Sequence, residues 1–200
     1  DSKQLKSAIS LSTSDWTTTV TLTLPTVNGN KEGTPETEVQ PDPITAISTG
    51  SYVIDKIGNE FTFVPELTLK VINATTGKTE EYKGVQDTNN EHAYHFGTGT
   101  EDVVTYFPKT ESAPAQFKWE INQDIPAGTT VTLSYKLKLA NPKTGTYGVK
   151  DLDGDGKVDD TGADVDTTKA LYTNKSAALY KDDKTKLAEF PMPSVSYTVS

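Results

Sequence analysis

A cluster of aspartates in the second half of the chain has the spacing of a calcium-binding loop. From Asp151 to Asp160 the sequence is DLDGDGKVDD, which follows the pattern D-x-D-x-D-G-x-apolar-D. In an EF-hand-type loop, carboxylates at positions 1, 3, 5 and 9 and the carbonyl of position 7 bind the ion, while a glycine at position 6 allows the turn. We therefore expect Ca²⁺ as a cofactor. The predicted ligands are Asp151, Asp153, Asp155, Asp159 and, through its carbonyl, Lys157.

This loop departs from the pattern at its end. Position 12 is Gly162, so Asp159, Asp160 or Asp164 would have to replace the usual bidentate glutamate. The flanking segments show no helical period, which predicts a lone calcium loop in an insertion at about residues 141–168. The alternative is a solvated acidic loop without a metal. Closely spaced carboxylates disfavour it, because they repel one another unless a cation lies between them.

Other residues that could support catalysis or metal binding lack the necessary context. His92 and His95 are the only histidines, and the chain has no cysteine to complete a zinc site around them, so we interpret this segment as a polar loop. The sequence contains no nucleophile motif, no histidine-centred triad and no cofactor loop. We therefore do not expect an enzyme that turns over a substrate.

Composition excludes several classes of protein. All 19 basic residues are lysines and the net charge is -9, so the chain has no basic face for a nucleic acid. The absence of arginine also weakens an assignment as a phosphate-handling enzyme. No apolar run approaches the roughly 20 residues that cross a membrane, and no signal peptide opens the chain. An exported protein of this sequence would therefore be part of a longer one.

The hydrophobic pattern predicts an all-β fold. In Thr130–Ala140 five apolar residues alternate with threonine, serine and lysine, and Trp16–Leu24 alternates in the same way. The sequence contains 32 threonines, which suit the exposed face of a strand. No segment has a convincing helical period. Further strands are predicted at Tyr52–Ile57, Phe61–Val64, Leu67–Ile72, Thr79–Tyr82, Val103–Phe107, Gln116–Ile121, Ala177–Tyr180 and Ser194–Val199.

Many short strands separated by Gly, Pro and Asn turns are typical of an antiparallel β-sandwich. No linker-like change in composition divides the chain, so we predict a single domain over residues 1–200 with two long loops, at 26–43 and 141–168.

Several of these segments resemble motifs of the immunoglobulin-like (Cna-type) domains of Gram-positive pilins and cell-wall-anchored adhesins. The similarity runs from about Lys6 to Val199 and departs from the family at Lys56, where proline is usual, and in the two long loops. It implies an Ig-like sandwich at the bacterial cell surface. The segments that carry it are Lys6–Ala8 followed by Trp16, YVIDKIGNEFTFVP (52–65), Thr130–Leu139, LYTNKSAAL (171–179) and FPMPSV (190–195).

The resemblance also implies an intramolecular isopeptide bond. In such domains a lysine amine of the first strand attacks the carboxamide of an asparagine on a late strand, and a buried acid assists. Matched by motif, the residues are Lys6, Asn174 and, as the acid, Asp55. The chemistry is physically reasonable, because burial favours the neutral, nucleophilic form of a lysine and the protonated form of a carboxyl group.

The choice of lysine is open at this point. Leu5, Ile9 and Leu11 share one parity, so a regular strand would direct Lys3 inward with them and Lys6 outward. A bulge near Ala8 would reverse the alternation and bring Lys6 inward. The spacing within the family favours Lys6, and Lys3 is the alternative.

These patterns predict a structural or stalk domain of a pilus or adhesin, anchored to the cell wall by a part outside this chain. Its partners would be the neighbouring domains of the same surface protein, with no nucleic acid and no membrane. The alternative function is a ligand-binding adhesin domain that recognises a host matrix protein or glycan through its long loops. The sequence shows no aromatic platform for a glycan, since Tyr147 is isolated in the second loop.

Overall fold

The computed structural model of the protein describes residues 6–8, 11–26, 46–97, 100–147, 171–195 and 197–199. Every regular element in these ranges is a β-strand, and every pairing is antiparallel. Within the same ranges no helix is long and apolar enough to cross a membrane. The all-β antiparallel prediction is therefore confirmed.

The first sheet has five strands in the order β1-β2-β12-β5-β6. Its strands are β1 (Lys6–Ala8), β2 (Thr17–Thr23), β12 (Thr130–Leu139), β5 (Phe61–Ile72) and β6 (Thr79–Lys83). Buried residues alternate with half-buried ones along all of β2 and along most of β12, as the sequence pattern predicted. One face of this sheet is therefore apolar, and the other carries threonine, serine and lysine.

The second sheet has seven strands in the order β16-β15-β4-β10-β9-β8-β7. Three pairs of short strands lie outside the two sheets: β3 (Ala46–Ile47) with β11 (Ile125–Pro126), β13 (Gly145–Tyr147) with β18 (Tyr197–Val199), and β14 (Leu171–Tyr172) with β17 (Ser194–Val195). The strands of the second sheet are β16 (Thr185–Glu189), β15 (Asn174–Asp182), β4 (Ser51–Ile57), β10 (Gln116–Ile121), β9 (Val103–Phe107), β8 (Ala93–His95) and β7 (Val85–Gln86).

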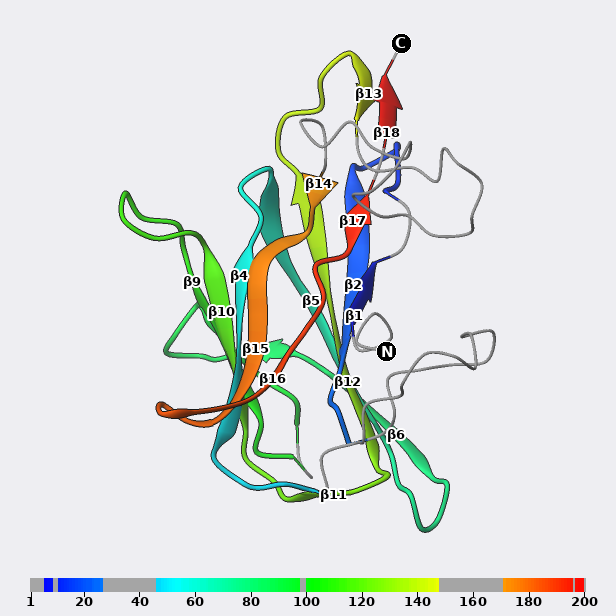
Figure 1. The fold of residues 1–200 in the computed structure, drawn as a ribbon, viewed down its shortest axis with the longest axis vertical. Coiled ribbons are helices and arrows are strands. Elements are labelled where there is room, and N and C mark those ends of the chain that lie inside the picture. The colour runs from blue at the N-terminus through cyan, green and yellow to red at the C-terminus, as the bar shows by residue number, and fades with distance from the viewer. Residues whose placement is uncertain are drawn as a thin grey trace.

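The main hydrophobic core contains residues of both sheets. In Figure 1 the strands β9, β10, β4 and β15 form one group on the left, and β5, β12, β2 and β1 form a second group to their right. The ring of Tyr135 on β12 meets Phe117 on β10 edge to face, with centroids 4.9 Å apart. Phe63 on β5 stacks on Tyr106 of β9 at 4.8 Å. The inner faces of the two sheets therefore pack against each other.

The strand predictions differ from the structure in β5, in β16 and in several strands of two or three residues, and the strand predicted at Ser194–Val199 is divided into β17 and β18. The strands predicted at Phe61–Val64 and Leu67–Ile72 form one strand, β5, whose register against β12 shifts between Ser134 and Lys136. Pro65 lies at this irregularity, where the absence of its N–H is tolerated. The strand β16 was not predicted, because its sequence TKLAE does not alternate.

Candidate functional site

Asp55 lies on the inner face of the seven-stranded sheet. In β4 the buried residues are Ser51, Val53, Asp55 and Ile57, and the side chain of Asp55 is 0% exposed. Its direct neighbours across the strands are apolar: Phe117 on β10 and Ala177 on β15. A carboxyl group in such a row is rare and requires a specific partner.

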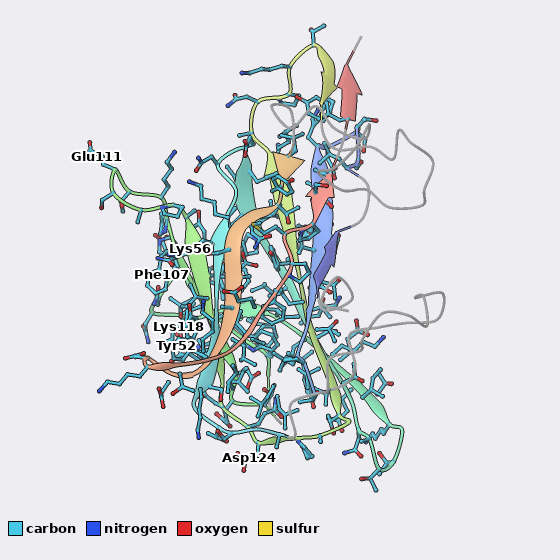
Figure 2. The ribbon with its side chains drawn as sticks, viewed as in Figure 1. Tyr52, Lys56, Phe107, Glu111, Lys118 and Asp124 are labelled. Atoms are coloured by element: carbon cyan, nitrogen blue, oxygen red, sulfur yellow. The ribbon has the colours of Figure 1, made fainter. Side chains whose placement is uncertain are left out.

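Residues of the opposite parity on β4 lie on the outer face. Tyr52 and Lys56 are less buried than Asp55, and Figure 2 shows them with Lys118 on the side of this sheet away from the five-stranded sheet. The amine of Lys118 lies 4.5 Å from the centroid of the Tyr52 ring. The acid on this strand that reaches the interior is therefore Asp55.

Tyr135 of the opposite sheet is hydrogen-bonded to Asp55. Its hydroxyl donates to Oδ2 of Asp55 at 2.6 Å, and the contact is buried. Burial, the charge of Asp55 and this hydrogen bond raise the pKa of Tyr135 well above its usual value, so the phenol remains protonated. The pair thus links β12 to β4 across the core.

Asn174 is also buried, at 1% exposure, and it opens β15 opposite Ile57. The register of β15 against β4 shifts between Asn174 and Ser176, so Asn174 and Ala177 both lie on the inner face although they are three positions apart. Asp55 is two residues along β4 from Ile57 and lies on the same face. The structure therefore brings the predicted acid and the predicted asparagine together as near neighbours.

The amide of Asn174 is incompletely satisfied among the residues that the structure describes. Its Oδ1 lies 3.3 Å from Thr173 Oγ1, whose one proton has a nearer acceptor in the Pro193 carbonyl at 2.9 Å, and its buried Nδ2 has no hydrogen-bond partner within these residues. An unsatisfied buried donor costs about 1–3 kcal/mol and is uncommon in folded proteins. A functional role would explain why this cost is tolerated.

Backbone contacts fix the position of Asn174. Thr173 donates from its N–H and its hydroxyl to the carbonyl of Pro193, at 2.8 and 2.9 Å, and its own carbonyl accepts from the N–H of Gly58 at 3.0 Å. A Cβ at Gly58 would lie 2.3 Å from the carbonyl oxygen of Tyr172. Glycine at position 58 therefore allows the close approach of the chain just before Asn174 to the end of β4.

Lys6 lies in β1, and its backbone pairs with that of Leu22 in β2. Leu22 pairs in turn with Leu133 of β12, which pairs with Leu69 of β5, and all three leucines are 0% exposed. The register position of Lys6 thus belongs to the row that faces the core. Lys3, the alternative partner, lies outside the described residues.

The predicted calcium loop falls outside the part of the chain that the structure describes. This applies to Asp151, Asp153, Asp155, Lys157 and Asp159, and to all of residues 148–170. Within the described ranges no group of three or more His, Cys, Asp or Glu side chains is arranged to bind a metal ion. Calcium binding therefore stays a prediction.

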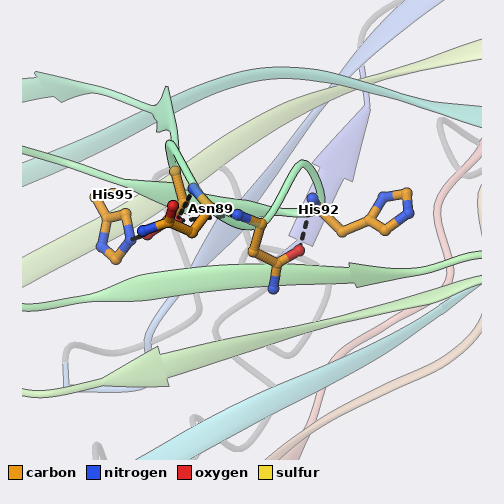
Figure 3. A network of polar contacts seen from close by, with 5 residues as sticks. Asn89, His92 and His95 are labelled. Atoms are coloured by element: carbon orange, nitrogen blue, oxygen red, sulfur yellow. Dashed lines mark hydrogen bonds and ion pairs between the residues drawn. The ribbon is translucent and has the colours of Figure 1, made fainter.

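The two histidines lie in the hairpin from β7 to β8, shown in Figure 3: His92 precedes β8, and His95 is the last residue of that strand. A ring nitrogen of His95 lies 2.7 Å from Oδ2 of Asp87, and Oδ1 of the same carboxylate accepts the backbone N–H groups of Asn89 and Asn90. These hydrogen bonds lower the pKa of Asp87, and the one from the backbone N–H of Asn89 has the largest effect. The N–H of His92 donates to the side chain of Asn90 at 3.0 Å. The segment is thus polar as predicted, but Ala93–His95 form strand β8 and are not part of a loop.

A second buried acid, Asp102, provides a contrast to Asp55. The indole N–H of Trp119 donates to its Oδ2 at 3.0 Å, and the backbone N–H of Asn122 donates to its Oδ1 at 2.9 Å. Burial raises the pKa of Asp102, while these hydrogen bonds oppose the rise. Each oxygen of Asp102 thus accepts a hydrogen bond, one from Trp119 and one from Asn122. A carboxylate satisfied in this way serves a structural role.

A cavity of about 280 Å³ adjoins Asn174. Its wall is formed by the turn after β4 and by the segments on either side of Asn174, including Glu60, Tyr172 and Met192. Met192 is about half exposed, so the cavity lies near the surface. It places space for a small molecule next to the asparagine.

Sequence reasoning missed the role of Tyr135. The pattern of β12 treats it as one more apolar residue in the row with Val131, Leu133, Leu137 and Leu139. It is the only member of this row with a polar tip, and a buried tyrosine hydroxyl normally finds a hydrogen-bond partner. That rule indicates a buried acceptor on the facing sheet, without identifying it.

Comparison with known proteins assigns no family to the chain. Scanned against models of protein families, the sequence matches none, and a search of curated proteins finds no matching sequence.

Proposed function

We propose that this chain is a structural, Ig-like β-sandwich domain of a bacterial surface protein, stabilised by an amide bond that it forms between Lys6 and Asn174. The observation that carries the proposal is the buried pair of Asp55 and Asn174 on neighbouring strands, at the inner face of one sheet. The resemblance to pilin and adhesin domains supplies the identity of the reaction.

The reaction joins two side chains and releases ammonia. The neutral amine of Lys6 attacks Cγ of Asn174, the Cγ–Nδ2 bond breaks, and a proton passes from the lysine nitrogen through the Asp55 carboxyl group to Nδ2. The products are a secondary amide and one molecule of ammonia, so no oxidant or cofactor is needed. Asn174 is among the residues that line the cavity, and through it the ammonia would leave.

The apolar surroundings favour this chemistry. Phe117 and Ala177 flank Asp55 on its own sheet. Low polarity favours the uncharged forms of an amine and a carboxyl group, which are the reactive forms here. Fixed neighbours also convert a very slow amidation between separate molecules into a unimolecular step.

The register of β1 supports Lys6 as the attacking residue. Lys6 pairs with Leu22, a member of the core-facing row, whereas its neighbour Ser7 pairs with Thr21 of the outer row. The bond would join the edge strand of the five-stranded sheet to a strand of the seven-stranded sheet. A covalent link between a first and a late strand resists separation of the sheets under tension, and it does not depend on redox conditions.

This function implies a place and partners. The domain would be extracellular, at the surface of a Gram-positive cell, and its partners would be adjacent domains of the same surface protein. It would react once and have no turnover activity. Binding of a host protein or glycan through the long loops is the alternative, and most of residues 26–43 and 141–168 lie outside the described part of the chain.

Intact-mass spectrometry of purified variants tests the proposal. The wild-type chain is expected to be lighter than its sequence by one ammonia, and Asn174→Ala, Lys6→Ala and Asp55→Asn are expected to have their full sequence masses. Asp102→Asn is the matched control, because it alters a buried acid that does not contact Asn174 and should leave the ammonia loss intact. A wild-type chain of full mass would refute the proposal, and ammonia loss in Lys6→Ala but not in Lys3→Ala would assign the bond to Lys3.

A further inference from the structure

We infer that Tyr135 is a positioning residue for bond formation: its hydroxyl fixes the orientation of the Asp55 carboxyl group between the two sheets. This inference rests on the proposed function, since it concerns the acid of that reaction. It assigns a role to a residue of β12, a strand of the facing five-stranded sheet that itself carries none of the reacting groups.

The geometry of the contact is specific. Tyr135 donates to Oδ2 of Asp55 at 2.6 Å, at the short end of the range for O–H···O hydrogen bonds. The phenol ring is held by Phe117, edge to face at 4.9 Å, and by Phe63, whose centroid lies 5.9 Å away. The donor therefore has little freedom to move, and neither does the oxygen that it binds.

The hydroxyl is a permanent donor. Because burial and the neighbouring Asp55 raise its pKa well above the usual value, Tyr135 keeps its proton at neutral pH. Oδ2 of Asp55 is thus engaged by Tyr135 throughout the reaction. The proton that moves from the lysine nitrogen to Asn174 Nδ2 is then carried by Oδ1, the other oxygen of the same group.

The sequence position of this tyrosine supports a specific role. Val131, Leu133, Leu137 and Leu139 show that the inward row of β12 is otherwise aliphatic. Phenylalanine would supply the same ring contacts without burying a hydroxyl, which costs free energy unless a partner accepts its hydrogen bond. Here that partner is the one acid that the proposed reaction requires.

The matched pair of variants is Tyr135→Phe and Trp119→Phe. Each removes one buried hydrogen bond from an aromatic side chain to a buried aspartate, but Trp119 contacts Asp102 and not Asp55. If orientation of Asp55 matters, Tyr135→Phe slows bond formation by roughly 10- to 100-fold, the scale expected when a reacting group is displaced by about 1 Å. Trp119→Phe tests whether any loosening of the core has the same effect.

The measurement is a pulse-chase of the full chain made by cell-free synthesis. Samples are quenched in denaturant at successive times, and the fraction that has lost ammonia is read by intact mass. The rate is recorded as a function of pH, because a hydroxyl that donates to a carboxylate favours its charged form. Loss of the donor is expected to move the midpoint of the pH profile upward in Tyr135→Phe and to leave it in place in Trp119→Phe.

A second variant covers the case in which Tyr135→Phe does not fold. Incorporation of 3,5-difluorotyrosine at position 135 retains the hydroxyl and makes it a stronger donor, so the pH midpoint should move downward. A wild-type rate and profile in Tyr135→Phe, an unchanged midpoint in the fluorinated chain, or equal slowing in Trp119→Phe would each overturn the inference. Failure of the proposed function is distinguishable, because the wild-type chain itself would then keep its full mass.

Discussion

Loss of the cross-link should lower the thermal stability of the domain by a predictable amount. Lys6 and Asn174 are 168 positions apart in the sequence. Closing a loop of this size removes about 5 kcal/mol of conformational entropy from the unfolded chain, by the relation used for disulfides. For a chain of 200 residues this corresponds to a decrease in Tm of roughly 10–20 °C when the bond cannot form.

Asp55→Asn is the mildest way to prevent the bond. Asparagine has nearly the same shape as aspartate and retains an oxygen that can accept from Tyr135, so its local cost is small compared with the loss of the cross-link. Asn174→Ala removes the same bond from the other side. The two substitutions should therefore be strongly non-additive, because the double variant can lose the cross-link only once.

The assay is thermal unfolding of the single and double variants, followed by circular dichroism. Asp102→Asn combined with Asp55→Asn is the control pair, since the hydrogen bonds that these two acids accept within the described residues come from different donors and their effects should add. The reasoning is refuted if Asp55→Asn unfolds within about 2 °C of the wild type, or if its effect adds fully to that of Asn174→Ala.

Three further predictions concern other parts of the fold. Gly58→Ala should lower the free energy of unfolding by about 1–3 kcal/mol, because the new Cβ would lie 2.3 Å from the Tyr172 carbonyl oxygen. It should also reduce the cross-linked fraction measured by intact mass. Gly77→Ala should leave that fraction unchanged, because no atom lies within 4 Å of a Cβ at this position. The pKa of Tyr52 is raised to about 12, mainly by its hydrogen bond to Asp183. The contribution of this hydrogen bond to stability is therefore present below pH 10 and is lost as the pH rises towards 12. NMR titration of labelled tyrosine should show this pKa, and it should return towards 10 in Asp183→Asn; an unchanged value would exclude Asp183 as the cause. Calorimetric titration with CaCl₂ should show binding that is lost when Asp153 and Asp155 are both changed to asparagine. If the wild-type chain takes up no Ca²⁺, the alternative of a solvated acidic loop without a metal is correct.

The regular part of the fold follows from the sequence. The strands β9 and β10 have the bounds predicted from alternation, and β12 ends one residue earlier than predicted. Alternation is informative there because one face of each strand is buried and the other is not. It gives no information where both faces are partly exposed or where a strand is two residues long, which is why β16 and the short pairs such as β3 with β11 were missed.

The inward direction of Asn174 could not be predicted from the hydrophobic pattern. With Ala177 and Leu179 facing inward, strict alternation along β15 would direct Asn174 outward, and only the register shift next to Ser176 brings it to the inner face. A single irregularity of this kind depends on the three-dimensional packing of the strand and leaves no mark in the local hydrophobic pattern. The motif resemblance selected Asn174 and Asp55 without this geometry.

The choice between Lys6 and Lys3 illustrates the same limit. The parity of Leu5, Ile9 and Leu11 favoured Lys3, whereas the pairing of Lys6 with Leu22 places Lys6 at a core-facing register position. Leu11 is buried as well, although it lies an odd number of positions from Lys6. Leu11 lies beyond the end of β1 at Ala8, so its burial does not decide between the two lysines.

Peptide mapping of the wild-type chain tests the central claim most directly. After proteolysis, tandem mass spectrometry should identify a branched peptide in which the segment containing Lys6 is joined to the segment containing Asn174, with a mass one ammonia below the sum of the two. Recovery of these two segments only as separate linear peptides of full mass would contradict the account.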